Sequence, residues 1–205
     1  MTAPFICIRP GASWPASALT PQAPHSFVLD GVRCASMESL LQAMRWRSVP
    51  QQERVCAMPA ATARSATVAA PDWRLTGILY WQGTCFRRGS HAHQRLMRRA
   101  WDALSSTPQF AGALEATGNA ALDSPISDDP EQTLLTRTEF VEALMACRAS
   151  IGRAQTLPLV LVIVQAVLTL TLILSGAPLA LLPLPATIFC AWMLWRRLRR
   201  KPASE

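Results

Sequence analysis

The sequence has little that would support a metal site, a disulfide framework or secretion. Its six cysteines include no Cys-x-x-Cys pair, and no histidine accompanies them at the spacing of a zinc finger. The first residues, MTAPFICIRPGASWPAS, lack a basic segment followed by an apolar stretch of about 7–15 residues. We therefore expect reduced thiols, no metal site and an N-terminal part that stays in the cytoplasm.

Charge is absent from two long stretches near the C-terminus. Half of the 205 residues are apolar and the mean hydropathy is +0.18, yet residues 1–156 carry 15 arginines and 12 acidic residues. Residues 157–174 and 179–195 carry no charged side chain. The sequence thus predicts a soluble part, which has roughly the length of one domain, followed by a membrane part over residues 157–195.

The two uncharged stretches have the length and the flanks of a transmembrane helical hairpin. The first has 18 residues, which span about 27 Å of a hydrocarbon core that is about 30 Å thick. The second ends in a basic cluster made of Arg196, Arg197, Arg199, Arg200 and Lys201. The positive-inside rule then predicts an anchor in the inner membrane, with the soluble domain and the basic tail, residues 196–205, in the cytoplasm. The alternative is a pair of buried helices in a soluble protein, which Pro183 and Pro185 favour.

The net charge of +7 gives no support for nucleic acid binding. Residues 1–156 contribute +3 (15 arginines minus 12 acids) and the remaining residues contribute +4 (five cations minus Glu205). A basic cluster directly after an apolar stretch suits an anionic lipid surface. We therefore expect a membrane rather than a nucleic acid as the partner of the basic tail.

The sequence of the soluble part predicts an α+β fold that is mainly helical with minor β structure. Prolines predict an irregular lead-in over residues 1–26, and the domain itself is expected over residues 27–150. A strand is predicted at 27–32, ending in an Asp-Gly turn, and a strand or short helix at 78–81. Helices are predicted from Ser36, at 53–69, from His93, at 108–116 and at 138–148.

Several motifs follow one another in an order that resembles a known superfamily. They are FVLDGVRCASMESLLQAMRW at 27–46, Asp72-Trp73-Arg74, LYWQG at 79–83, MRRAWDALSSTPQFAGALEATGNAAL at 97–122, Asp129-Pro130 and TLLTRTEFVEALMACR at 133–148. The chain resembles the NADAR superfamily, also called YbiA-like, and within it an uncharacterised bacterial and phage branch. The resemblance covers roughly residues 27–148 and implies the NADAR fold.

The resemblance also implies an activity. Members of the superfamily process N-glycosidic bonds to ribose in ADP-ribose, nucleotide or riboflavin-pathway compounds. Breaking such a bond develops positive charge on the ribose, so a carboxylate near C1′ stabilises it or activates water, and a second group assists the departing base. The expected ligand is therefore a small nucleotide or ADP-ribose-like compound, and the chemistry needs no cofactor.

The motif positions assign candidate roles within this sequence. Glu38 matches the helix glutamate of the superfamily, Trp73 the tryptophan of its Asp-Trp element, and Asp129 approximates its later acid. We expect Glu38 to act as base or cation stabiliser, Trp73 as a stacking platform and Asp129 as second carboxylate. Gln42 would orient Glu38 or a phosphate, because positions i and i+4 share a helix face.

Bidentate arginine contacts suggest Arg87 and Arg88 as binders of a pyrophosphate. Each candidate has a structural alternative. A glutamate early in a helix favours the helix dipole, a tryptophan is often core, aspartate before proline often begins a turn, and Arg87 and Arg88 could form a solvated loop. His91 and His93, at the start of a predicted helix, could contact a phosphate, but we expect them to be exposed and solvated.

The sequence also departs from the superfamily, or from its closer branch, at four places. Thr20-Pro21-Gln22 stands where members commonly have Ser-Asn-Phe, and the Trp-Gly-x-Gly element of many members is absent. Arg88-Gly89-Ser90 stands where the branch has Arg-His-Ser, and Ser124-Pro125-Ile126-Ser127 where it has His-Ser-Ile-Gly. These changes leave two further functions open: a noncatalytic sensor that binds a nucleotide or ADP-ribose, and a structural domain whose pocket has decayed.

Overall fold

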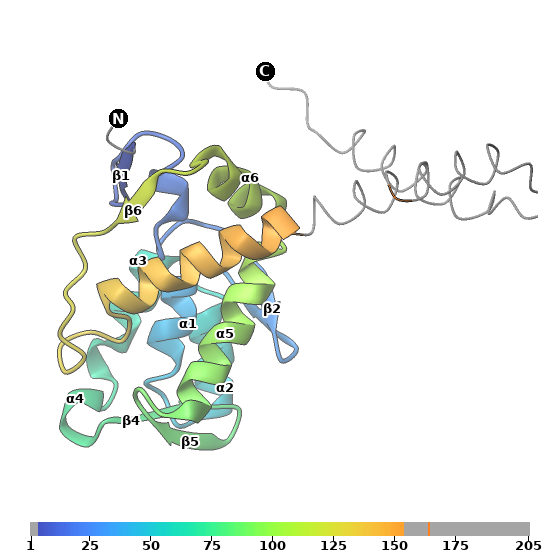
Figure 1. Cartoon of the computed structure of the whole chain (residues 1–205). Coiled ribbons are helices and arrows are strands. Elements are labelled where there is room, and N and C mark those ends of the chain that lie inside the picture. The colour runs from blue at the N-terminus through green and yellow to red at the C-terminus, as the bar shows by residue number, and fades with distance from the viewer. Residues whose placement is uncertain (1–3, 154–163, 165–205) are drawn as a thin grey trace, which may run out of the picture. The chain divides into compact units, whose positions relative to one another are not determined.

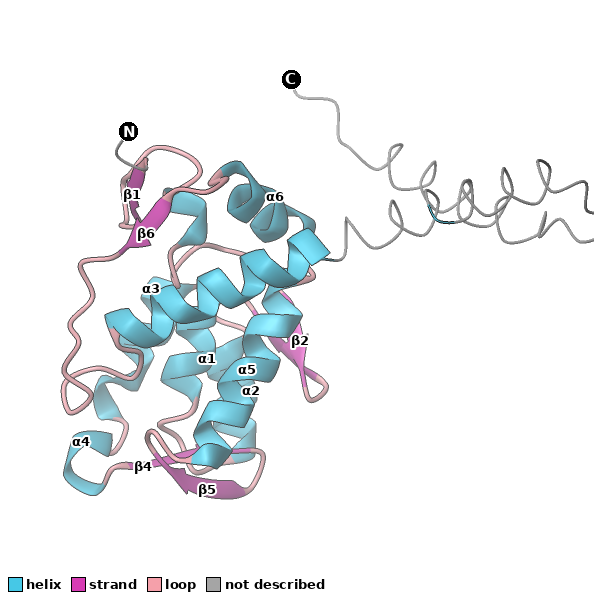
Figure 2. Cartoon of the chain, viewed as in Figure 1, coloured by secondary structure: helices cyan, strands magenta, loops and turns pink. Residues whose placement is uncertain are grey.

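The computed structural model describes residues 4–153 and residue 164. The chain divides into two units, Met1–Ala149 and Ser150–Glu205. The first contains the helices and strands discussed below, except for the last residues of the final helix, 150–153. Figure 2 shows three pairs of short strands at the margins of a helical centre. The mixed α+β class predicted from the sequence is confirmed for this part of the chain.

The N-terminal segment contains regular structure where the sequence predicted an irregular lead-in. Strand β1 (Phe5–Cys7) pairs in parallel with β6 (Ala121–Asp123), and a short 3₁₀ helix, η1, covers Ser17–Leu19. Ile8 and Leu19 are 1% and 0% exposed. The sequence did not predict this strand because the partner of β1 lies more than a hundred residues away, and no local pattern indicates such a pairing.

The predicted strand and turn at 27–32 form a β-hairpin. Strands β2 (Phe27–Leu29) and β3 (Val32–Cys34) are antiparallel, and their outer residues are buried while the middle ones are exposed. Asp30 and Gly31 in the turn have φ angles of 50° and 83°. Such left-handed pairs match the twist of a two-residue hairpin. The Asp30 carboxylate also accepts hydrogen bonds from Trp81 Nε1 (2.8 Å) and Arg99 Nη1 (2.6 Å).

Helix α1 (Met37–Ala43) begins where the sequence predicted. The Ser36 hydroxyl accepts a hydrogen bond from the Ser39 amide at 3.1 Å, which satisfies an N-terminal donor. Glu38 lies in its first turn, and Gln42 is the one residue of the helix that is not fully buried. This helix therefore serves both the core and, through one face, the site described below.

The single helix predicted over 53–69 is wrong. The structure has α2 (Val49–Cys56), α3 (Ala60–Ala66) and a 3₁₀ helix η2 (Thr67–Ala69). Pro59 separates α2 from α3, because a proline disfavours helical geometry in the residue before it. The break turns α3 so that it packs against both α1 and α2.

Helix α4 (Trp73–Thr76) is a single turn that precedes a second hairpin. The Asp72 carboxylate caps it through the Arg74 amide at 3.1 Å, and Gly77, with a φ of 65°, ends it. Strands β4 (Ile78–Trp81) and β5 (Thr84–Arg87) follow as an antiparallel pair. Of the two structures that the sequence left open at 78–81, the strand is the one present.

Three further helices complete the core. Helices α5 (His91–Ser105) and α6 (Pro108–Ala116) lie where the periodicity placed them, and a last helix occupies residues 137–153 of the described chain. The Trp101 ring lies 5.9 Å from Phe140 and 6.3 Å from Phe110, measured between ring centroids. Helix 137–153 and α5, which cross in Figure 1, are therefore in contact through Trp101 and Phe140.

Apart from residue 164, the predicted transmembrane hairpin, residues 157–195, and the basic tail lie outside the described residues. Within the part that is described, no helix combines the length and the apolar character needed to cross a bilayer.

Candidate functional site

A cleft of about 280 Å³ opens beside the polar face of α1. Helices α1, α3 and α4 contribute charged and amide side chains to its lining, and three loops, residues 20–22, 124–126 and 132–135, supply the rest together with Ile8 and Pro10. Two of the segments at which the sequence departs from the superfamily or its branch therefore contribute to the lining, through residues 20–22 and 124–126. Residues 88–90, another departure, are not part of it.

Glu38 is held in this cleft through one of its oxygens. Its Oε1 accepts hydrogen bonds from Gln42 Nε2 at 3.0 Å and Arg64 Nε at 3.1 Å, and Arg64 Nη2 completes an ion pair with it at 3.0 Å. The residue is 8% exposed, and its Oε2 has no hydrogen-bond partner among the described residues. The arrangement fixes the carboxylate and leaves one oxygen available to a ligand or to water.

Gln42 connects Glu38 to a second arginine. Its Oε1 accepts hydrogen bonds from Arg45 Nη1 at 3.1 Å and from the buried Thr67 hydroxyl at 2.8 Å. These two donors fix the amide so that its NH₂ group faces Glu38. Gln42 therefore lies where the sequence predicted that it orients Glu38, and its part in any reaction stays a prediction.

Trp73 also lines the cleft, but it presents little ring surface. It is 5% exposed, and the Arg74 guanidinium carbon lies 5.5 Å from the centre of its ring. Cation–π contacts of this length hold a guanidinium in place. A base stacked on that face of the ring would have to displace Arg74, so Trp73 supports Arg74 in this conformation.

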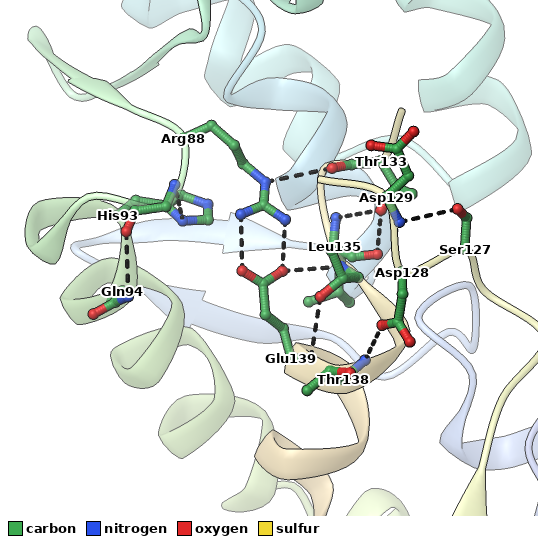
Figure 3. Close-up of polar contacts among 12 residues, drawn as sticks. Arg88, His93, Gln94, Ser127, Asp128, Asp129, Thr133, Leu135, Thr138 and Glu139 are labelled. Atoms are coloured by element: carbon green, nitrogen blue, oxygen red, sulfur yellow. Dashed lines mark hydrogen bonds and ion pairs between the residues drawn. The ribbon is translucent and has the colours of Figure 1, made fainter. Parts of the chain in front are cut away.

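Asp129 lies outside the lining of the cleft. Its Oδ1 accepts a hydrogen bond from the Glu131 amide at 2.9 Å, and its own amide donates to Ser127 Oγ at 3.1 Å. Its carbonyl oxygen accepts hydrogen bonds from the amides of Gln132 and Thr133, as Figure 3 shows in part. The structure thus places Asp129 at the start of a turn, the structural alternative for aspartate before proline.

Arg87 and Arg88, the predicted pyrophosphate binders, are likewise not among the residues that line the cleft. Arg87 is exposed at the end of β5. The Arg88 side chain is 7% exposed and forms a bidentate ion pair with Glu139, with N–O distances of 2.8 and 2.6 Å. Its Nε also donates to the Thr133 carbonyl at 3.4 Å (Figure 3). Arg88 is occupied in joining β5 to the loop that precedes helix 137–153.

Glu139 completes this junction by capping helix 137–153. Its Oε2 accepts from the Thr136 amide at 2.9 Å, while the Thr136 hydroxyl accepts from the Glu139 amide at 3.2 Å. This reciprocal pair is a capping box. Burial raises the pKa of Glu139, but the hydrogen bonds from Arg88 and Thr136 outweigh it and lower the pKa overall.

The prediction that His93 is exposed is wrong, whereas His91 is exposed as predicted. His93 is 2% exposed, because it falls on the face of α5 that also buries Leu96 and Met97. Its Nδ1 accepts from the Gly89 amide at 3.3 Å, and its buried Nε2 has no partner in the described chain. Burial, helped by the charge of Arg88 and opposed by Glu139, lowers the pKa of His93 to about 4.

Three arginines of the cleft, Arg45, Arg64 and Arg74, were not predicted from the sequence. Arg45 could have been found, because it lies three residues after Gln42, in the turn that directly follows α1. Arg74 follows Trp73 directly. Arg64 carries no such signal, since only the packing of α3 against α1 brings it to Glu38.

Comparisons with known proteins match this part of the chain to a phage protein family. The family model described as Bacteriophage protein GP30.3 matches residues 13–149. A relative from Enterobacteria phage T4, described as an uncharacterized 17.1 kDa protein in the Gp30-rIII intergenic region, is 31% identical over 147 residues. That match covers 70% of this chain and 97% of the relative.

The NMR structure of the E. coli protein YbiA superposes with a TM-score of 0.53 at 15% identity, covering 76% of this chain and 89% of YbiA. At this identity the likeness concerns the fold alone. The sequence matches thus concern a phage protein family, and the structural match shows a YbiA-like fold.

Proposed function

The chain belongs to the Bacteriophage protein GP30.3 family, and from that premise we propose that its cleft hydrolyses an N-glycosidic bond to ribose. The substrate class is an ADP-ribose-like, nucleotide or riboflavin-pathway compound. One observation carries the proposal: Glu38 is the acidic side chain in the described lining, and its Oε2 is open while Oε1 is held by Gln42 and Arg64.

In this mechanism Glu38 acts on water at the anomeric carbon. The bond between C1′ and the base nitrogen breaks, and its electron pair leaves with the nitrogen. Oε2 accepts a proton from the water whose oxygen forms the new bond to C1′, and then returns that proton to the departing base. The anionic carboxylate also stabilises the positive charge that develops on the ribose.

The remaining charges of the cleft favour an anionic substrate. Arg45, Arg64 and Arg74 face a single carboxylate, so the lining carries an excess of positive charge. A phosphate-bearing ribose compound would meet that charge, whereas a neutral nucleoside would not.

The test uses substitution of Glu38 with a matched control. The purified full chain should release a free base from a member of a panel of nucleotides, ADP-ribose derivatives and ribosylamino phosphates, followed by mass spectrometry. Glu38→Gln keeps the size of the side chain but removes the base, and should lower kcat by about 10²–10⁴-fold. Glu142→Gln, which changes an exposed glutamate of helix 137–153, should not change the rate. An unaltered rate in Glu38→Gln would disprove the assigned role.

A noncatalytic sensor is the second candidate, favoured by the position of Asp129. With Asp129 in a turn outside the cleft, Glu38 has no second carboxylate beside it in the described lining, and Arg64 already neutralises Glu38. A sensor would bind a nucleotide or ADP-ribose without consuming it. Thermal stabilisation by a panel member that stays intact after prolonged incubation would favour this function.

We also propose that residues 157–195 attach the domain to the inner membrane, with residues 196–205 in the cytoplasm. The proposal rests on two uncharged stretches with cations at both outer ends. A reporter fused after Glu205 should be active if it is one that works only in the cytoplasm. If the full chain and residues 1–156 both fractionate as soluble proteins, the proposal is wrong.

A further inference from the structure

Arg45 is a cation of the cleft whose charge is not matched by a carboxylate. Its Nη1 donates to the neutral amide of Gln42 at 3.1 Å. Its Nε is buried and has no hydrogen-bond partner among the described residues. An N–H group that is shielded from water and unpaired is unfavourable, so a ligand oxygen that reached it after a side-chain rotation would satisfy it.

Arg74 lines the same cleft from α4 and is only partly compensated. Its Nη2 donates to the Gln132 carbonyl at 3.1 Å, and its Nη1 lies 3.6 Å from Asp72 Oδ1. That distance is long for a hydrogen bond, and both side chains are nearly half exposed. Trp73 beneath the guanidinium and the Gln132 carbonyl beside it therefore fix Arg74 in position without cancelling its charge.

The two guanidinium groups act on each other. Burial, followed by the charge of Arg74, lowers the pKa of Arg45, and Asp72 opposes the effect. Arg64 differs from both, because it makes two contacts to the Glu38 carboxylate at 3.0 and 3.1 Å. The cleft thus contains one arginine, Arg64, whose charge is neutralised, and two, Arg45 and Arg74, that repel each other. An anion bound between these two would reduce the repulsion.

We propose that Arg45 and Arg74 form an oxyanion site that binds a phosphate group of the ligand. Arginine suits this task because its planar fork matches phosphate oxygens in a bidentate manner. The inference deepens the proposed function, on which its placement beside Glu38 rests, and it moves phosphate binding from Arg87 and Arg88 to two arginines inside the cleft.

Gln42 gives the site its geometry relative to Glu38. Its carbonyl oxygen accepts from Arg45 and its amide nitrogen donates to Glu38, so a single side chain spaces the anion-binding group from the carboxylate. Glu38 and Gln42 lie on one face of α1, and Arg45 lies in the turn that directly follows the helix. A ligand whose phosphate contacts Arg45 and Arg74 would extend its adjoining ribose along this face toward Glu38.

The experiment measures binding of inorganic anions to the purified full chain by calorimetry at low ionic strength. Inorganic diphosphate and orthophosphate serve as probes, and the tighter of the two indicates whether the site fits a diphosphate or a single phosphate. Arg45→Gln and Arg74→Gln should each weaken binding by about tenfold or more, because each removes a charge-assisted contact. Arg98→Gln removes the same charge from the exposed face of α5 and should change binding less than twofold.

The outcomes separate this inference from the proposed hydrolysis. Glu38→Gln should retain anion binding even if it abolishes turnover, and an absence of turnover in the wild-type chain leaves the anion measurement valid. Arg74→Gln, on a partly exposed single-turn helix, keeps the test available if Arg45→Gln fails to fold. The inference is overturned if neither probe binds with saturation, or if Arg98→Gln weakens binding as much as the two cleft variants.

Discussion

At the residue scale, Arg88 and Arg45 are both partly buried, but their hydrogen-bond partners indicate different roles. Arg88 has both ends of its guanidinium matched by Glu139 and its Nε directed at the Thr133 carbonyl. Arg45 has one neutral partner and an unpaired Nε. A matched cation inside a fold stabilises the structure around it, whereas an unmatched one beside a cavity is a candidate for ligand binding.

Removing Arg88 should therefore destabilise the fold. Arg88→Met leaves Glu139 without its partner, and we expect a loss of about 1–3 kcal/mol in the free energy of unfolding, less than for a fully buried pair because Glu139 is 37% exposed. Urea unfolding of the full chain measures it. Arg87→Met, at the exposed neighbouring position, should change stability by less than about 0.5 kcal/mol. Equal effects of the two substitutions would contradict the assignment.

The lowered pKa of His93 leads us to expect a loss of stability in mild acid. Its pKa is about 4 in the folded chain, whereas a histidine in an unfolded chain titrates near ~6.5. At a pH between these two pKa values, the unfolded state binds a proton at His93 that the folded state does not. The contribution of neutral His93 to stability is therefore fully present above about pH 6.5, and the free energy of unfolding falls by about 3 kcal/mol as the pH drops to about 4.

Comparing the free energy of unfolding at pH 7.5 and 4.5 measures this difference. His93→Gln should reduce the difference, and His91→Gln, at an exposed position, should leave it as in the wild type. Carboxylates contribute to the acid effect in all three chains and cancel in the comparison. A pH dependence that His93→Gln leaves unchanged would exclude His93 as its source.

At the scale of elements, the sequence predicted those helices and strands that are stabilised by residues close together in the chain. Ser36 indicates the start of α1 because its hydroxyl caps that helix, and the Asp-Gly turn indicates the β2–β3 hairpin because both residues adopt left-handed geometry. The pairing of Glu38 with Gln42 was equally predictable, since both lie on one helix face. The contribution of Arg64 was not, because it depends on how α3 packs after the break at Pro59.

The capping box at the start of helix 137–153 gives a prediction for that element. Thr136→Ala removes the hydroxyl that accepts from the Glu139 amide and should cost about 1 kcal/mol of unfolding free energy. Thr136→Ser retains the acceptor and should recover most of the loss. Urea titration of both variants measures the difference, and the role of the cap is wrong if serine and alanine destabilise equally.

At the scale of the whole molecule, the N-terminal strand β1 is joined to β6, which lies more than a hundred residues later in the chain. Sequence motifs placed the start of the domain at residue 27, yet β1 pairs with β6 and the Ile8 amide donates to the Asp123 carbonyl at 2.7 Å. The family model also begins before residue 27, at residue 13. Long-range parallel pairing has no local signature, since neither three-residue strand shows an alternating pattern that would reveal its partner.

This closure predicts that the N-terminal segment stabilises the domain as strongly as its interior does. Ile8 is 1% exposed and also lines the cleft, so Ile8→Ala should cost about 2–5 kcal/mol of unfolding free energy, the range for a buried aliphatic side chain. Val28→Ala, at a position 59% exposed in β2, should cost less than about 0.5 kcal/mol. Ile8 lines the cleft with an apolar side chain, whereas Arg45 supplies a charge to the proposed oxyanion site. Ile8→Ala should therefore weaken diphosphate binding less than Arg45→Gln does. If Ile8→Ala unfolds at the same urea concentration as the wild type, residues 1–26 are a lead-in after all.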